Sequence, residues 1–252
     1  MTKAEKLQSI LDSKDAIKQA ILAKGVSCGD TLSDYPNRIA AITSKFVVPT
    51  GLKFQSSSSI TQAVIDQMDF TQLTNAQYLF GGTTFGSDIE ISLPKAMSIR
   101  GAFMNCMLTG SEINVTCPAL YNSESYFGAF QNTIIPQITL SLTKNENPQD
   151  FNRVFYYSAA ETINLICPDN KIQSWVDTFT NCGNLVNLHL ETQIVADLDL
   201  STCTQLSVDS LVGVIAKLVS GMNKTLTLGN TNLAKLTSGE KAVATAKGWT
   251  LA

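Results

Sequence analysis

A strand-like segment recurs along the chain at a nearly constant spacing. In each copy every second residue is apolar, and such alternation predicts a β-strand with one buried face. The middle apolar residues follow one another by 24, 25, 25 and 23 positions; they are Ile91, Val115, Leu140, Leu165 and Leu188. Such a period indicates one structural unit repeated in tandem.

A phenylalanine recurs in phase with these strands, and a small polar or Cys residue follows it by two or three positions. The series is Phe80, Phe103, Phe130, Phe155 and Phe179. Neither apolar series can be buried within one repeat, so neighbouring repeats must stack and share a continuous core. We predict that this core includes Phe103, Phe130, Phe155, Phe179, Ile91, Val115, Leu140, Leu165 and Leu188.

The best-preserved copies of the repeat lie at residues 102–106 and 179–190. They resemble the leucine-rich repeats of the BspA-like type, in which a Phe and a Cys precede a Leu-rich strand that ends in Pro. The resemblance covers roughly residues 66–203 and implies a leucine-rich-repeat-like β-solenoid. The copy at Phe155 departs from the pattern because it lacks both the Asn and the Cys.

Residues 4–24 have the apolar stripe of an amphipathic helix, which Gly25 can end. The stripe approaches the heptad spacing of helices that oligomerise, and it equally fits a helix packed against its own domain. We assign oligomerisation and attachment to Leu7, Ile10, Leu11, Ile17, Ile21 and Tyr35.

The next segment, residues 24–42, resembles a short module at the start of many tailed-phage virion proteins. It reads Lys-Gly-Val, then Thr-Leu-Ser-Asp-Tyr-Pro, then the Ile-x-x-Ile of a short helix. The resemblance implies a helical hairpin that attaches the chain to other virion proteins of the capsid or tail. Because such a hairpin is too small to be stable alone, we expect a homo-oligomer, a trimer, joined through residues 1–45.

The last segment, from residue 207, combines helical stripes with short strands, and its Thr-Ser-Gly-Glu run at 237–240 is a capping box. Its ending, Lys-Gly-Trp-Thr-Leu, resembles the closing segment of phage proteins of the same kind. We predict an α+β fold in four parts: an N-terminal helical hairpin module (1–45), a linker (46–63), the solenoid (64–206) and a helical and strand C-terminal cap (207–252).

Composition excludes several classes of partner. Charged residues make up 15% of the chain and the net charge is −3, whereas nucleic-acid binding needs clustered Lys and Arg. We expect no membrane insertion and no signal peptide, because neither a long apolar run nor an apolar segment after Met1 is present.

Six cysteines and one histidine give little scope for metal chemistry. The cysteines form no C-x-x-C pair, so we expect no metal site and no cofactor. Most of them occupy apolar positions of the repeat, where a free Cys acts as a small buried hydrophobe; disulfides are the alternative.

The outward residues of the strands are short and polar: Glu90, Ser92, Asn114, Thr116, Thr139, Ser141, Asn164, Asn187 and His189. Such a ribbon suits hydrogen bonding to a sugar or a protein, although any exposed sheet face also needs polar residues that favour strands.

The two phage-type segments together imply a non-enzymatic virion structural protein, a head or tail fibre or decoration protein on the virion surface. It would bind a host-surface glycan or protein. The alternatives are a bacterial cell-surface leucine-rich-repeat adhesin and a glycan-cleaving enzyme. We identify no catalytic residues, because no pair of carboxylates and no nucleophile with a base stands out.

Overall fold

The computed structural model describes residues 45–54, 60–118, 125–142 and 149–252, together with five residues of an N-terminal helix, Asp15, Lys18, Gln19, Leu22 and Ala23. For Gln149 and residues 168–171 it describes the backbone alone. The chain divides into two compact units, Met1–Phe46 and Val47–Ala252. The hairpin expected over residues 1–45 lies outside the described residues, apart from these five and Lys45.

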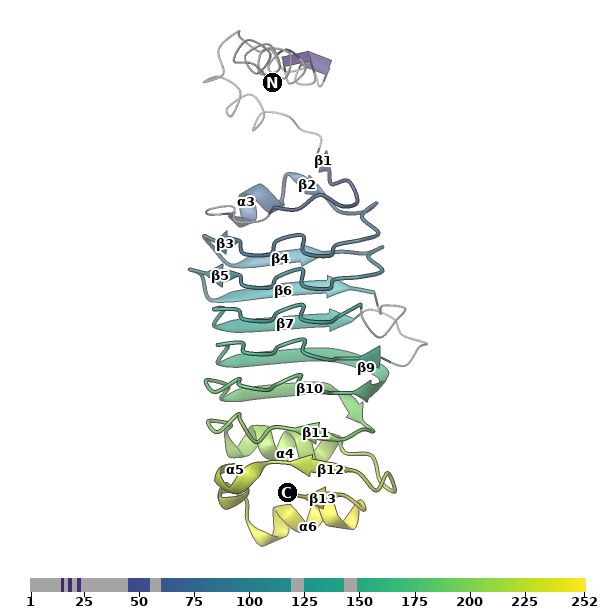
Figure 1. The fold of residues 1–252 in the computed structure, drawn as a ribbon, viewed down its shortest axis with the longest axis vertical. Helices are drawn as coiled ribbons and strands as arrows, with labels where there is room; N and C mark the ends of the chain where they lie inside the picture. Colours follow the sequence, from purple (N-terminus) through teal and green to yellow (C-terminus); the bar gives the residue numbers. More distant parts are fainter. Residues whose placement is uncertain are drawn as a thin grey trace, which may run out of the picture. The chain divides into compact units, whose positions relative to one another are not determined.

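A six-stranded sheet forms the centre of the second unit. Its main path follows the order β10-β9-β7-β6-β4, and every pairing is parallel. The strands are β4 (Ile89–Ser92), β6 (Glu112–Cys117), β7 (Gln137–Leu142), β9 (Thr162–Ser174) and β10 (Asn187–Ile194), with β8 (Gln149–Asp150) paired to β9. Figure 1 shows these strands following one another along the unit with their arrowheads in the same direction. Each repeat therefore contributes one strand to a shared sheet.

The register of the last strand differs from the one read off the sequence. Ile91, Val115, Leu140 and Leu165 pair in succession, but the partner of Leu165 on β10 is Leu190. Leu188 pairs instead with Ile163. Alternation has a period of two residues, so it assigns the face of a strand but leaves shifts of two residues undetermined.

A column of stacked phenylalanines lies behind the sheet. Phe103 and Phe130 have ring centroids 5.0 Å apart and planes 5° from parallel, and Phe155 follows Phe130 at 5.6 Å. The column continues to Phe80 at one end and Phe179 at the other, both at 5.6 Å. Offset aromatic stacking adds about 0.5 to 1.5 kcal/mol per pair beyond burial. This column and the inward strand residues form one core.

The turn that carries each phenylalanine uses left-handed backbone on both sides of the ring. Two positions after it stand Asn105, Asn132, Tyr157 and Asn181, with φ between 55° and 60°. Two positions before it stand Tyr78, Gly101, Gly128, Arg153 and Asp177, with φ between 54° and 62°. Asn and Gly adopt this conformation most readily, which explains the Asn that precedes Cys in the best repeats.

The side chain three positions after the phenylalanine ties neighbouring repeats together. The Cys106 thiol donates to the carbonyl of Phe80 at 2.9 Å, and the Cys182 thiol donates to that of Phe155 at 3.0 Å. In the Phe155 repeat Ser158 takes this position and bonds to Thr133 at 2.9 Å. A small hydrogen-bonding residue meets the requirement, so Cys itself is dispensable there.

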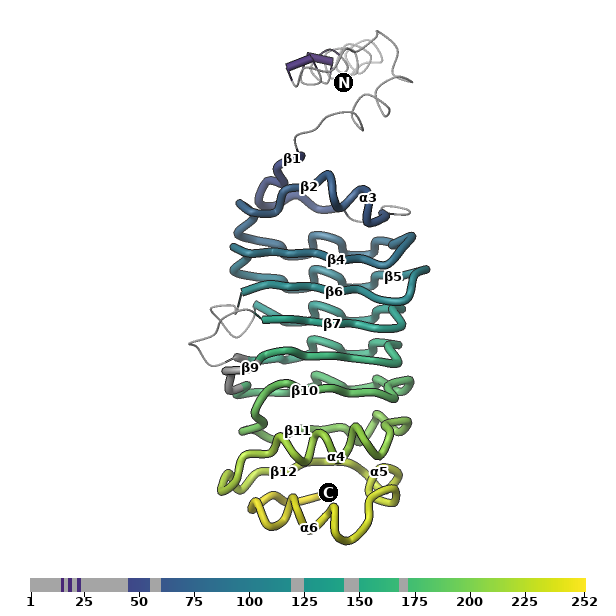
Figure 2. Tube along the Cα trace, turned by 180° about the vertical axis from the view of Figure 1, so that it is seen from behind, coloured from purple at the N-terminus to yellow at the C-terminus, as the bar shows by residue number. Residues whose placement is uncertain are grey.

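Three short sheets and four helices complete the described part of the chain. The helices are α3 (Gln62–Ile65), α4 (Val208–Lys217), α5 (Gly229–Lys235) and α6 (Ser238–Ala246). β1 (Phe46–Val47) pairs with β2 (Met68–Asp69), and β3 (Thr84–Phe85) pairs with β5 (Met107–Leu108). β11 (Leu198–Asp199), β12 (Thr225–Thr227) and β13 (Thr250–Leu251) form a parallel sheet. Figure 2 shows α4 and α6 from behind, beyond β10.

The expected fold class is wrong. We expected an α+β chain with a leucine-rich-repeat-like β-solenoid and a helical and strand cap, whereas the described residues form an α/β structure of mostly parallel sheets. The C-terminal elements show the reason most clearly. Helices α4 to α6 alternate with the parallel strands β11 to β13, and such alternation defines the α/β class.

Both edges of the main sheet are covered by helices through side chain to backbone hydrogen bonds. At β4 the side-chain amide of Gln62, on α3, bonds to Glu90. At β10 the hydroxyl of Ser210, on α4, accepts from the Leu188 N–H at 3.0 Å and donates to the Val186 carbonyl at 3.1 Å. Such cover removes the unpaired backbone groups that make an edge strand prone to aggregation.

Candidate functional site

The exposed face of the main sheet carries polar side chains in straight columns. Parallel pairing places Glu90, Asn114, Thr139, Asn164 and His189 side by side on successive strands. A second column begins with Ser92, Thr116 and Ser141 and ends with Ile166 and Glu191. A third contains Glu112, Gln137, Thr162 and Asn187. The face therefore presents hydroxyls and amides with few charges.

Several of these side chains bond to one another across the strands. The Asn164 amide donates to the Thr139 hydroxyl at 3.0 Å, and the Gln137 amide donates to the Glu112 carboxylate at 2.7 Å. The Asn187 amide donates to Thr162 at 3.3 Å. Such bonds hold the side chains in place and give the face a regular hydrogen-bonding pattern.

His189 lies on the exposed face opposite Asn164, and it makes no hydrogen bond to a serine or threonine hydroxyl among the described residues. Within the described ranges no group of three His, Cys, Asp or Glu residues is placed to hold a metal ion. None of the described helices is long and apolar enough to cross a membrane.

The described cysteines are all buried. All five described cysteines are free, and burial raises the pKa of Cys106 and Cys117 to about 12 from an ordinary 9.0. A nucleophilic cysteine requires a lowered pKa, and the pKa of Cys106 and of Cys117 is raised instead.

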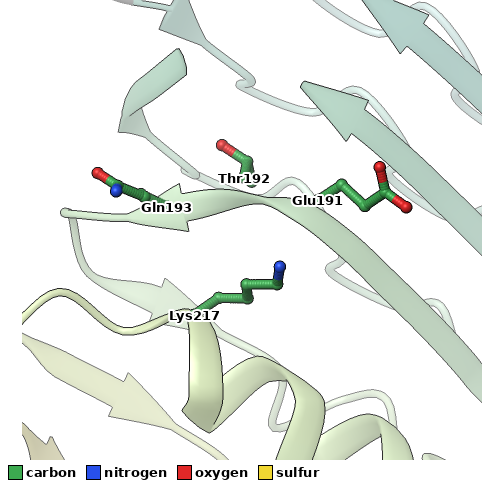
Figure 3. Close-up of a pocket in the computed structure, with 4 residues that line it drawn as sticks. All are labelled: Glu191, Thr192, Gln193 and Lys217. Atoms are coloured by element: carbon green, nitrogen blue, oxygen red, sulfur yellow. The ribbon is translucent and has the colours of Figure 1, made fainter. Parts of the chain in front are cut away.

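A shallow depression of about 420 Å³ lies where β10 meets the end of α4. Figure 3 shows Glu191, Thr192 and Gln193 on β10. Lys217, the last residue of α4, extends its side chain toward that strand. The pairing of β10 with β9 shifts register between Glu191 and Gln193, which marks an irregularity in the strand. The depression is open, and its lining offers one ammonium group and one carboxylate.

Sequence reasoning missed a cluster of aromatic and arginine side chains on the turns that carry the phenylalanines. Arg100, Phe127, Arg153 and Tyr156 contact one another through cation–π interactions, and Tyr157 packs against Tyr156. These residues lie in turns, where no periodic pattern marks them. The available signal was the departure of the Phe155 repeat, which has Tyr157 where three other repeats have Asn and the Phe80 repeat has Gly82.

The residues assigned to the repeat core are all buried in the structure, with exposed fractions of 2% or less: Phe103, Phe130, Phe155, Phe179, Ile91, Val115, Leu140, Leu165 and Leu188. The residues assigned to oligomerisation and attachment lie outside the described residues: Leu7, Ile10, Leu11, Ile17, Ile21 and Tyr35.

Residues 247–251, near the end of the chain, have distinct structural roles. Lys247 donates to the carbonyls of Ile215 and Ala216 at the end of α4, and Gly248, at φ 82°, ends α6. The indole of Trp249 is buried and donates to the Val219 carbonyl at 2.8 Å. The remaining two residues form β13.

No family model matches the chain, no curated protein is significantly similar to it in sequence, and no solved structure matches it.

Proposed function

We propose that this chain is a non-enzymatic structural protein on the surface of a tailed-phage virion, a fibre or decoration protein of the head or tail. Residues 1–45 would attach it, as a trimer, to other virion proteins, and the second unit would bind a host-surface glycan or protein. The N-terminal part of the proposal rests on the resemblance of residues 24–42 to phage attachment modules.

The observation that carries the binding role is the exposed face of the main sheet. Its parallel columns present amides and hydroxyls that are already oriented by bonds such as Asn164 to Thr139. Because the side chains are held before binding, they lose little conformational entropy when a matching ligand binds.

Antibody labelling of purified virions tests the proposal. An antibody raised against the full chain should label the surface of virions of the phage whose genome encodes it, and electron microscopy should place the label on the head or the tail. Virions that carry none of this chain would contradict the proposal. Labelling of uninfected cells instead would favour the bacterial adhesin, and shortening of a surface glycan by the purified protein would favour an enzyme.

A further inference from the structure

Cys182 and Cys203 occupy equivalent positions in two successive turns of the stack. The Cys182 thiol donates to the carbonyl of Phe155 at 3.0 Å, and the Cys203 thiol donates to the carbonyl of Phe179 at 3.3 Å. The Phe179 carbonyl also accepts from the backbone N–H of Cys182 at 3.2 Å, so both cysteines meet at one oxygen atom. The two side chains are buried and hydrogen-bond to each other. Their sulfur atoms are therefore direct neighbours.

The same position in the two preceding repeats shows how close such neighbours come. Thr133 and Ser158 take it there, and their hydroxyl oxygens are 2.9 Å apart. Parallel strands in a sheet lie about 4.8 Å apart. A disulfide requires Cα atoms about 4.4 to 6.8 Å apart. The stacking distance of the repeats thus matches the distance that a disulfide bridges.

Hydrogen bonding alone does not explain two adjacent cysteines. Thr133 and Ser158 make their bonds at this position through hydroxyl groups, so the fold accepts Ser or Thr there. The other described cysteines have no cysteine beside them in the stack. Cys106 has a threonine in the turn on either side, and β7 separates Cys117 on β6 from Cys167 on β9. Among the described residues, the pair is therefore confined to one place.

We propose that Cys182 and Cys203 form a disulfide bond when the chain folds in the presence of glutathione disulfide or a similar disulfide oxidant. One cysteine thiolate attacks the oxidant and releases one glutathione thiolate, and the second cysteine then displaces the other glutathione. The two protein thiols lose two protons and two electrons and gain one S–S bond, while the oxidant is reduced to two glutathione molecules. The structure shows the pair in its reduced form.

The bond has to form before the two thiols are buried. Thiol–disulfide exchange needs a thiolate that the oxidant can reach. In the folded chain both side chains are fully buried, and the hydrogen bond from Cys182 together with burial raises the pKa of the Cys203 thiol. Exchange is therefore slow after folding, whereas both thiols are accessible while the chain folds.

The disulfide would fasten the C-terminal elements to the repeat that carries Phe179. The backbone carbonyl of Cys203 accepts from the side-chain amide of Asn232, on α5, at 3.2 Å. Cys182 lies three positions after Phe179 on the other side of the cross-link. A cross-link restricts the unfolded chain, so the oxidised protein should unfold at a higher temperature than the reduced protein.

The test is refolding of the full chain from urea, once with reduced and oxidised glutathione and once with dithiothreitol. After the glutathione refold, digestion and mass spectrometry should find a fragment with Cys182 linked to a fragment with Cys203. The thermal midpoint should lie about 5 to 10 °C above that of the dithiothreitol sample. Cys182→Ser keeps a donor for the Phe155 carbonyl, so it should fold in dithiothreitol but show no rise with glutathione. The matched control Cys106→Ser should keep the rise.

The proposal is overturned if alkylation finds both thiols free after the glutathione refold, or if they are joined to glutathione and not to each other. It is also overturned if Cys182→Ser shows the same rise in thermal midpoint as the natural chain, or if the linked protein unfolds no higher than the reduced one. The fragment analysis uses the natural chain alone, so it decides the proposal even where a variant fails to fold.

Discussion

The side-chain amide of Gln62 hydrogen-bonds both backbone groups of Glu90. Its Oε1 accepts from the Glu90 N–H at 2.8 Å, and its Nε2 donates to the Glu90 carbonyl at 3.2 Å. One side chain thus makes the two bonds that another strand would make at this position of β4. The edge of the sheet is closed there without a further strand.

Loss of this contact should open the edge of β4. Gln62→Ala removes both bonds, so we expect the free energy of unfolding to fall by about 1 to 2 kcal/mol. The exposed edge should also promote self-association at high concentration. Urea denaturation and light scattering measure the two effects. Gln67→Ala, on an exposed residue just beyond α3, serves as the control, and equal behaviour of the two variants would contradict this role of Gln62.

The phenylalanine column should contribute strongly to stability. Phe130 is fully buried between Phe103 and Phe155, so Phe130→Ala should lower the free energy of unfolding by about 3 to 5 kcal/mol. His189→Ala, on the exposed face, should change it by less than about 0.5 kcal/mol. Denaturant titration compares the two, and similar losses would show that the inward and outward assignments are wrong.

The two tryptophans should respond differently to replacement by phenylalanine. The Trp249 indole donates to Val219, whereas the Nε1 of Trp175 is buried with no hydrogen-bond partner among the described residues. Trp249→Phe leaves the partly buried Val219 carbonyl without its donor. Trp175→Phe instead removes a buried N–H donor that has no acceptor among the described residues. We expect Trp249→Phe to destabilise the protein by about 1 to 2 kcal/mol more. A larger loss for Trp175→Phe in urea denaturation would contradict this.

Alkaline pH should destabilise the protein through its buried thiols. Above pH 9.0 the unfolded chain loses protons at Cys106 and Cys117, while the folded chain keeps them until about pH 12. The unfolded state then binds fewer protons, so the free energy of unfolding falls as pH rises from 9.0 to about 12. Cys106→Ser keeps a donor for the Phe80 carbonyl but does not titrate there. Its urea midpoint should fall less between pH 8 and pH 10.5, and an equal fall would contradict the assignment.

Local periodicity explains which parts of the structure the sequence could predict. Alternation places Ile91 and Ser92 on opposite faces, because side-chain direction in a strand has a period of two. The same period cannot distinguish Leu188 from Leu190 as the partner of Leu165, since both point inward. Local patterns could not predict the fold class either, because it depends on the parallel pairing of β11, β12 and β13 across intervening helices.

The candidate functional residues also fall into a group that the sequence could predict and a group that it could not. Strand periodicity identified the outward columns of the sheet. The cluster of Arg100, Phe127, Arg153 and Tyr156 instead arises from contacts between repeats. Arg100 and Phe127 are distant in sequence, and only the stacking of the repeats brings the guanidinium onto the ring. A departure from the repeat consensus, such as Tyr157, is the sequence signal that could have directed attention to this surface.

The central claim is that the N-terminal residues 1–45 attach the chain to the virion. It is tested most directly by measuring how much of each chain segment is present in purified virions. The phage would be grown with the full chain, with residues 46–252 alone, or with residues 1–45 fused to a fluorescent protein, and each product would be quantified by mass spectrometry of the virions. We predict that the full chain and the fusion are incorporated and that residues 46–252 are not. Incorporation of residues 46–252 with exclusion of the fusion would contradict attachment through the N-terminus.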